Sequence, residues 1–328
     1  MSGTPSVSAS SSTMAADPTP LVIAHRGASG HRPEHTLEAY TLAVHMGADY
    51  IEPDLVSTKD GVLVARHENE IGGTTDVAQR FPDRKVTKRI DGDSITGWFT
   101  EDFTLAELRT LRARERLNFR DQSYNGQFSI PTFDEVLALA DSLGRAKGRV
   151  VGVYPETKHP TYFRSIGLAL EQPLVASLAR AGWNRADAPV FIQSFEVMNL
   201  RALKAQTPVR LIQLIAGGSP ADKAQNADVP TYEQMLTVEG LRDVARYAYG
   251  IGPEKRLVLP MERGETTLVR DAHAAGLKVH IWTLRKEAQF IGSRFAGDVE
   301  AEARAFVAAG VDGVFADHPD LVARAIRN

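Results

Sequence analysis

The sequence contains no cysteine among its 328 residues. Disulfide bonds, a thiolate nucleophile and cysteine metal ligands are therefore all excluded. Any metal site must consist of Asp, Glu and His side chains and carbonyl oxygens. Because cysteine-free chains occur inside and outside the cytoplasm, this absence leaves the cellular location open.

A strong net charge and a long hydrophobic run are also missing. The 38 Lys and Arg residues nearly balance the 41 Asp and Glu residues, for a net charge of −3. No overall field therefore favours nucleic acid or an acidic membrane. No run of about 18 apolar residues is present, so stable membrane insertion is not expected. The sequence also lacks a glycine-rich phosphate loop, a dinucleotide fingerprint and a serine nucleophile elbow.

What is present is ordinary for a globular protein, with 43% hydrophobic residues and a length sufficient for a large core. Residues 1–20 are rich in Ser, Thr, Ala and Pro without periodicity, and we predict a disordered tail there. They lack the basic start and apolar centre of a secretion signal. From Leu21 onwards we expect one domain that extends to residue 328.

Short apolar segments alternate with helical stretches along that domain. The predicted strands are Leu21–Arg26, Tyr50–Ser57, Val62–His67, Val150–Thr157, Val190–Phe195, Arg210–Ile215, Lys278–Leu284 and Asp312–Asp317. Helical periodicity occurs between many of them, at Thr36–Met46, Glu196–Lys204, Thr266–Ala275 and Glu300–Ala309. Nearly continuous apolar strands are typical of parallel sheets covered on both faces. The pattern predicts an α/β fold, a (β/α)8 TIM barrel, with a doubly wound sheet as the alternative.

Two features do not fit a regular barrel. Val62–His67 follows the preceding strand after a turn too short for a crossover helix, so it is either a hairpin or an irregular barrel strand. The next connection, about residues 68–125, is predicted to be an insertion after the third strand, over the barrel mouth. Capping boxes at Thr104–Glu107 and Thr132–Glu135 indicate two helix starts, and Gly144 indicates a helix end.

Chargeable side chains gather at the predicted strand ends. Glu52 and Asp54 alternate on one strand, so both carboxylates point to one face, about 6–7 Å apart along the chain. Buried together they would repel, and a divalent ion such as Mg²⁺ or Ca²⁺ would remove that cost. Glu156 and Lys158 repeat the pattern, as a third oxygen ligand and a cation for an anionic substrate. Taken alone, each pair could instead be solvated or a surface ion pair of little energetic value.

Two histidines are candidates for proton transfer. His25 and His67 each end an apolar strand, and imidazole is the commonest general acid–base group near neutral pH. The planar guanidinium of Arg26 suits a phosphate or a carboxylate. Other strand ends carry Gln193, Phe195 and Trp282. These side chains either belong to the core or line a pocket for a small polyol.

In order along the chain, "AHRG…PEHT", "EPDLVSTKDGVLVARHE", "ETK", "QSF", "WT" and "DGVFADHP" resemble the motifs of the glycerophosphodiester phosphodiesterase family. The resemblance implies a TIM barrel that uses a divalent cation to hydrolyse glycerophosphodiesters to sn-glycerol 3-phosphate and an alcohol. It implies catalysis by His25 and His67. The metal ligands that it implies are Glu52, Asp54 and Glu156, and the substrate-binding residues are Arg26, Glu34, Lys158, Gln193, Phe195 and Trp282.

The sequence departs from the family motifs at His35, Pro53, Glu68 and Arg285, which leaves the implied ligands intact but the substrate preference open. The long connection resembles that of a subgroup that is often exported and tends to use Ca²⁺. The resemblance therefore implies one divalent cation, Ca²⁺ more than Mg²⁺, and a periplasmic or extracellular location. The expected partner is a small-molecule glycerophosphodiester, with no nucleic acid; the oligomeric state stays open.

Two other functions remain possible at this point. The same site could cleave phospholipid head groups in a phospholipase-D-like reaction, or the barrel could bind an anion or polyol without catalysis. A binder needs the cation and Arg26 but not a pair of acid–base groups, so the two histidines favour an enzyme. Gly72–Thr100 is too polar for a core of its own. Six apolar side chains from its end onwards can nevertheless pack on the barrel: Trp98, Phe99, Phe103, Leu105, Leu108 and Leu111. We therefore expect the 68–125 segment to dock as a cap that narrows the mouth and favours water-soluble diesters over phospholipids.

Overall fold

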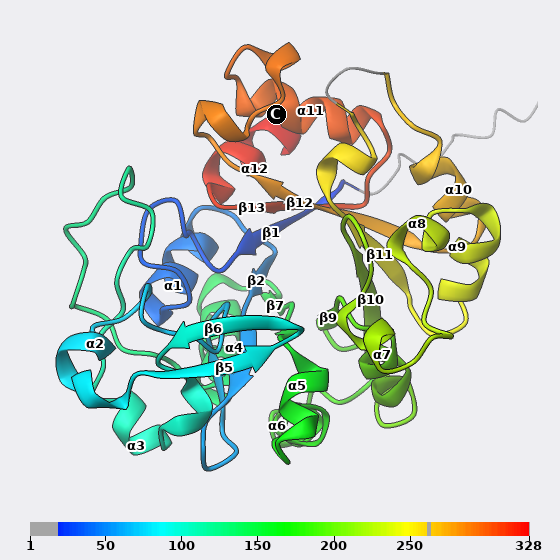
Figure 1. The fold of residues 1–328 in the computed structure, drawn as a ribbon. Helices are drawn as coiled ribbons and strands as arrows, with labels where there is room; N and C mark the ends of the chain where they lie inside the picture. Colours follow the sequence, from blue (N-terminus) through cyan, green and yellow to red (C-terminus); the bar gives the residue numbers. More distant parts are fainter. Residues whose placement is uncertain (1–18, 261–263, 328) are drawn as a thin grey trace, which may run out of the picture.

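The computed structural model describes residues 19–260 and 264–327. Most of the predicted tail, residues 1–20, therefore lies outside the described residues. The centre of the molecule is a curled sheet of 11 short strands surrounded by helices (Figure 1). Its strands are β1 (Leu21–His25), β2 (Tyr50–Glu52), β3 (Asp54–Ser57), β4 (Leu63–Ala65), β7 (Gly152–Val153), β8 (Glu156–Thr157), β9 (Phe191–Ser194), β10 (Arg210–Ile215), β11 (Gly250–Pro253), β12 (Lys278–Leu284) and β13 (Gly313–Ala316).

Helices pack around the outside of this sheet (Figure 1). The α-helices are α1 (Leu37–His45), α2 (Val77–Arg80), α3 (Leu105–Leu108), α4 (Phe133–Lys147), α5 (Pro160–Ser165), α6 (Glu171–Arg180), α7 (Val197–Lys204), α8 (Tyr232–Met235), α9 (Val238–Val244), α10 (Leu268–Ala274), α11 (Val299–Ala308) and α12 (Pro319–Arg327). Short 3₁₀ helices lie at Pro82–Arg84, Thr100–Asp102, Ala221–Ala224, Lys255–Leu257, Ala288–Phe290 and Ser293–Phe295. The four helical stretches predicted from periodicity are confirmed as α1, α7, α10 and α11. No helix in the described ranges is long and apolar enough to cross a membrane.

The strand order is β4-β3-β8-β9-β10-β11-β12-β13-β1-β2-β7. All neighbours in this order are parallel except β3 and β4. β1 pairs with both β2 and β13, so the first and last strands of the domain are neighbours, as in a barrel. Pro53 and Pro155 lack the N–H that a ladder needs, which explains why β2 and β3, and likewise β7 and β8, are separated. The fold is TIM-barrel-like.

One predicted strand pairs differently from the rest, and one strand was missed. The segment predicted as Val62–His67 contains β4, which pairs antiparallel with β3, so the hairpin alternative is confirmed. The long connection therefore follows this hairpin and not a third parallel strand. β11 was not predicted, because "GIGP" has little of the apolar, β-branched character of a strand. A Cβ at Gly250 would lie 2.6 Å from the Lys278 carbonyl oxygen, which explains why glycine occupies this strand.

The 68–125 segment is more structured than its polarity suggested. It contains an antiparallel hairpin of β5 (Val86–Ile90) and β6 (Asp93–Gly97), and its aromatic residues Phe99 and Phe103 are buried. The Thr104–Glu107 capping box is confirmed at α3, and the Thr132–Glu135 capping box is confirmed at α4.

The prediction that Gly144 ends a helix is wrong. Helix α4 continues to Lys147 and ends at Gly148, which has a left-handed φ of 60°. Gly144 lies inside the helix, where a Cβ would approach the Arg149 carbonyl oxygen to 3.0 Å. A glycine required for close packing had the same sequence signal as a helix terminator.

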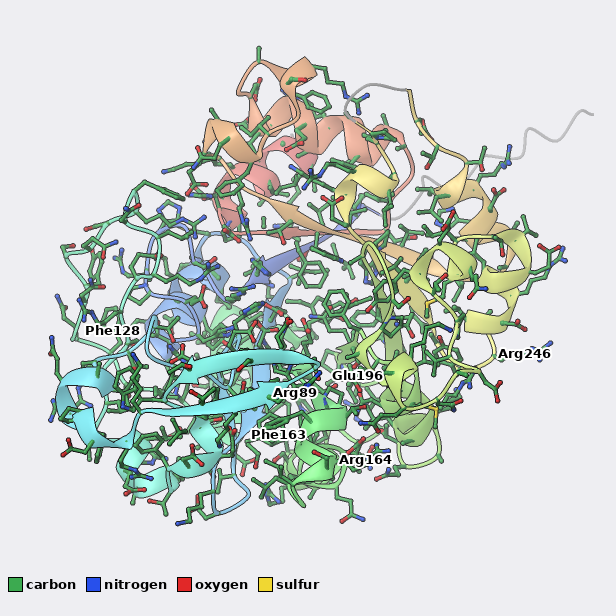
Figure 2. The ribbon with its side chains drawn as sticks, viewed as in Figure 1. Arg89, Phe128, Phe163, Arg164, Glu196 and Arg246 are labelled. Carbon is green, nitrogen blue, oxygen red and sulfur yellow. The ribbon has the colours of Figure 1, made fainter. Side chains whose placement is uncertain are left out.

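A small apolar cluster fills the inside of the curled sheet: Ile23, Tyr154, Phe191, Ile212 and Phe315. Figure 2 shows how densely side chains occupy this central region. The buried His280 accepts or donates a hydrogen bond at the Tyr154 hydroxyl, at 2.8 Å, which satisfies both polar groups. This cluster forms a solid base, and the polar residues at the carboxyl ends of the strands lie beyond it.

Candidate active site

A cavity of about 80 Å³ lies at the carboxyl ends of the parallel strands. Among the residues predicted to form the site, those that line the cavity are His25, Arg26, Glu52, His67, Glu156, Lys158, Gln193, Phe195 and Trp282. The remaining two, Glu34 and Asp54, contact Arg26 directly. Residues more than 250 positions apart in the chain thus meet in one small volume, as expected where parallel strands end together.

Three carboxylates form the centre of the site. Oxygen atoms of Glu52, Asp54 and Glu156 all lie within 4.8 Å of one another, and all three side chains are buried. Glu52 and Asp54 flank Pro53, while Glu156 is the register partner of Asp54 on the adjacent strand. The prediction that these carboxylates share one side of the sheet is confirmed.

The buried carboxylates perturb one another's ionisation. Burial and the charge of Asp54 raise the pKa of Glu52 well above its usual range. Burial also raises the pKa of Glu156 to about 8, although Lys158 opposes the shift. Burial disfavours ionisation of Asp54 too, but the hydrogen bond from His35 and the charge of Lys158 outweigh it and hold its pKa well below normal. The cluster therefore needs a proton or an additional cation to offset the repulsion between its buried negative charges.

The cluster fits a divalent cation. Asp54 Oδ1 and Gln193 Oε1 are buried without a hydrogen-bond partner among the described residues. Buried oxygens of this kind are costly unless something coordinates them. A set made only of carboxylate and amide oxygens suits Mg²⁺ or Ca²⁺ better than Zn²⁺.

His25 is held by a carboxylate on the neighbouring strand. Its Nδ1 lies 2.6 Å from Oδ1 of Asp317, which follows β13. Burial and the charge of Arg26 lower the pKa of His25 to about 4, against the effect of Asp317. Asp317 in turn accepts a hydrogen bond from Arg120 Nη2 at 2.6 Å and lies 3.0 Å from Arg285 Nε. Asp317 belongs to the "DGVFADHP" motif, but nothing in the sequence alone indicated its contact with His25.

His67 has a comparable arrangement. Its Nδ1 lies 2.9 Å from Glu68 Oε1, and its Nε2 lies 3.4 Å from Lys158 Nζ. A lysine ammonium only donates, so Nε2 accepts and the proton of neutral His67 lies on Nδ1. Burial and the charges of Arg26 and Lys158 lower the pKa of His67 to about 3. The imidazole thus presents an unprotonated Nε2 toward the cavity.

Glu68 is also bound from its other side. Its Oε2 lies 2.7 Å from Nε2 of His159, and Nδ1 of His159 lies 2.5 Å from Oδ2 of Asp91. Burial lowers the pKa of His159, but its hydrogen bonds to Asp91 and Glu68 outweigh burial and raise it to about 9. His159 was not identified from the sequence, because its partners are 68 and 91 positions away.

Arg26 is fixed on several sides. Its guanidinium contacts Glu34 Oε2 at 3.1 Å and Asp54 Oδ2 at 3.3 Å. Glu34 also binds Arg116 Nε at 3.0 Å. Glu34 does not line the cavity and instead holds the arginine that does. His35, which departs from the family motif, contacts Asp54 Oδ2 through Nε2 at 2.9 Å.

Aromatic rings form one wall of the cavity. Phe195 and Trp282 meet edge to face, with ring centroids 5.7 Å apart. Trp282 Nε1 donates to the Gly252 carbonyl at 2.7 Å, which fixes the ring. A second cavity of about 240 Å³ adjoins the first and shares Glu156, Lys158 and Phe195 with it. The site thus combines charged groups for an anion with an apolar wall for carbon atoms.

Residues 25–321 match the model of the "Glycerophosphoryl diester phosphodiesterase family". The chain belongs to this family. A glycerophosphodiester phosphodiesterase of Arabidopsis thaliana is 38% identical to it, over 91% of this chain and 83% of the relative. One from Haemophilus influenzae is 32% identical, over 92% and 88%. The family assignment confirms the predicted enzyme class, a phosphodiester hydrolase.

Solved structures of similar proteins support the fold. A phosphodiesterase from Oleispira antarctica, solved in complex with the product sn-glycerol-3-phosphate, is 23% identical to this chain. The two superpose with a TM-score of 0.65, over 94% of this chain and 98% of the other. At this level of identity the similarity establishes the shared fold.

The ion pairs of His159 lead to a pH-dependent contribution to stability. The folded-state pKa of about 9 lies above the ordinary value of 6.5, so this contribution is complete below pH 6.5 and lost as the pH rises through 9. The full shift corresponds to about 3 kcal/mol. Between pH 6.5 and 10 the unfolding free energy of the wild type should fall by up to this amount more than that of His159→Gln. Urea unfolding across this pH range tests the expectation, and parallel pH curves for the two proteins would contradict it.

Proposed function

We propose that the protein hydrolyses glycerophosphodiesters to sn-glycerol 3-phosphate and an alcohol, with one divalent cation and two histidines. The observation that carries this proposal is a single cavity lined by two members of a cluster of three carboxylates, by two cationic side chains and by two carboxylate-bound histidines. The names of the relatives and the product bound to the Oleispira protein support this substrate class.

Glu52, Asp54 and Glu156 would hold the cation. When bound, a divalent ion supplies Lewis-acid stabilisation of the charge on the phosphoryl oxygens. The oxygen-only donor set supports Mg²⁺ or Ca²⁺, and the resemblance to the longer subgroup favours Ca²⁺. His35 and Arg26 keep Asp54 ionised, which maintains its ability to act as a ligand.

Arg26 and Lys158 would bind the substrate phosphodiester. Both line the cavity and both are buried, at 6% and 8% exposure. Because the phosphoryl oxygens gain negative charge in the transition state, fixed cations in a dry site stabilise it more than the ground state. The wall formed by Gln193, Phe195 and Trp282 would contact the carbon skeleton of the substrate.

His25 and His67 would transfer protons. In each, Nδ1 is engaged by a carboxylate, which directs Nε2 toward the substrate. Nε2 of His67 would become available once Lys158, which donates to it at 3.4 Å, binds the substrate phosphate instead. One histidine takes the proton from the attacking hydroxyl or water. The other would have to enter the reaction as imidazolium, with a proton on Nε2 that it donates to the leaving alcohol, and the negative charge of the bound phosphodiester favours that form. Such a carboxylate–histidine arrangement fixes the tautomer and the ring orientation.

We further interpret the domain from residue 21 onwards as a single (β/α)8 barrel, in which β2–β3 and β7–β8 each count as one interrupted strand. The 68–125 segment would then be an insertion within one connection. A cap formed by this segment, as predicted from its polarity, would favour water-soluble diesters over membrane phospholipids. The periplasmic or extracellular location rests on resemblance alone.

A substrate panel with and without chelator tests the activity. Release of glycerol 3-phosphate from glycerophosphocholine, glycerophosphoethanolamine and glycerophosphoglycerol should exceed release from intact phospholipid.

EDTA should abolish turnover, and Ca²⁺ should restore it, because the carboxylate cluster requires a cation. The cation should also raise the Tm of the wild type and of the exposed control Glu239→Gln, but not of Asp54→Asn. Full activity after exhaustive chelation would contradict a metal-dependent site. Choline or ethanolamine release from intact phospholipid would support the phospholipase-D-like alternative.

Removal of either histidine tests the acid–base roles. His25→Ala and His67→Ala should each lower kcat by at least about 100-fold, since general acid–base catalysis commonly contributes this much. An aryl diester, whose leaving group needs no proton, should partly rescue only the variant that lacks the acid. His45→Ala, at an exposed position of α1, is the matched control. Near-normal turnover of a natural diester by His25→Ala or His67→Ala would remove that histidine from the mechanism.

A further inference from the structure

The 68–125 segment contacts the surroundings of both site histidines. We propose that it positions His25 and His67 through two separate connections, one ending at Asp91 and the other at Arg120. This inference rests on the proposed function of the two histidines. It adds positioning residues that do not line the cavity between the histidines, although Asp91 lines the adjoining one.

The first connection starts at the turn of the β5–β6 hairpin. In Figure 1 this hairpin extends from the side of the molecule toward its centre. Asp91, in that turn, binds His159 Nδ1 at 2.5 Å, and His159 Nε2 binds Glu68 Oε2 at 2.7 Å. The other oxygen of Glu68 lies 2.9 Å from Nδ1 of His67. The hairpin turn is thus linked to a site histidine by three consecutive side-chain contacts.

The second connection comes from the loop that precedes α4. Arg120 Nη2 donates to Asp317 Oδ2 at 2.6 Å, while Asp317 Oδ1 binds Nδ1 of His25. Arg120 also donates to Glu287 at 2.7 Å and to the Ser29 carbonyl at 3.1 Å. Its side chain is only 6% exposed, although it belongs to a loop. Each of the three guanidinium nitrogens of Arg120 donates one of these hydrogen bonds, so the planar group is held from three sides and can fix the carboxylate that it binds.

These contacts matter because an imidazole ring can rotate. A carboxylate at Nδ1 fixes the tautomer and directs Nε2, but only if the carboxylate is itself held in place. For Asp317 that support comes from Arg120 and Arg285, and for Glu68 it comes from His159. A displacement of a catalytic group by about 1 Å can reduce turnover by as much as 100-fold. Arg285 would still contact Asp317 after the loss of Arg120, and His159 would still contact Glu68 after the loss of Asp91. We therefore expect the loss of Arg120 or of Asp91 to reduce turnover by less than 100-fold.

The test compares Arg120→Ala and Asp91→Ala with Arg109→Ala in the full-length, cation-loaded protein. Arg109 is a matched control, because it belongs to the same segment and its ion pair with Glu135 is exposed. Each test variant should lower kcat about tenfold on glycerophosphocholine, with KM changed less than twofold, and Arg109→Ala should resemble the wild type. The conservative variants Arg120→Lys and Asp91→Asn should recover part of the loss.

Imidazole NMR of histidine-labelled protein provides a readout that does not depend on activity. Arg120→Ala should shift the His25 resonances and leave those of His67 in place, while Asp91→Ala should do the reverse. The resonances are assigned with His25→Ala and His67→Ala. Unshifted resonances in both variants, or an unchanged kcat with wild-type resonances, would overturn the proposal. If the wild type lacked diesterase activity while these selective shifts occurred, the proposed function would fail but the positioning contacts would stand.

Discussion

The three buried carboxylates at the strand ends are the constraint on which the site depends. Glu52, Asp54 and Glu156 lie within 4.8 Å of one another in a buried environment, where like charges repel strongly. The surrounding residues reduce this repulsion by ion pairs and hydrogen bonds to each carboxylate: Arg26 and His35 at Asp54, Gln193 at Glu52 and Lys158 at Glu156. Under the proposed function, a divalent cation would complete the neutralisation and place positive charge beside the substrate phosphate.

Residues 68–125 interrupt the regular α/β pattern, and they supply many of the contacts that hold the site residues in place. Arg116 holds Glu34, which binds Arg26, and Arg120 holds the carboxylate that orients His25. Its hairpin turn reaches His67 through His159 and Glu68. This largely polar segment is structured because buried ion pairs attach it to the rest of the domain and because several of its apolar side chains belong to the main hydrophobic core: Ile71, Val77, Phe103, Leu108 and Leu111. The cost is desolvation, which complete pairing of the charges offsets.

Local patterns in the sequence were sufficient to predict most of the sheet and the cluster of carboxylates at the centre of the site. Glu52 ends β2 and Asp54 begins β3, on either side of Pro53, and the two carboxylates still converge as the period-2 alternation of a strand predicts. β11 was missed because Gly250 is needed for close packing against a neighbouring strand, a requirement that leaves no apolar signal. The contacts of Asp317 and His159 were missed because they join residues far apart in the chain. Tertiary contacts of single side chains have no local periodicity, and only the folded structure reveals them.

A crystal structure of the protein with Ca²⁺ and sn-glycerol 3-phosphate tests the central claim most directly. The account predicts one ion with carboxylate oxygens of Glu52, Asp54 and Glu156 at about 2.3–2.6 Å. It also predicts the product phosphate beside that ion, within reach of Arg26 and Lys158. An ion bound elsewhere, or a phosphate outside this cavity, would contradict the claim that the buried carboxylates organise the active site.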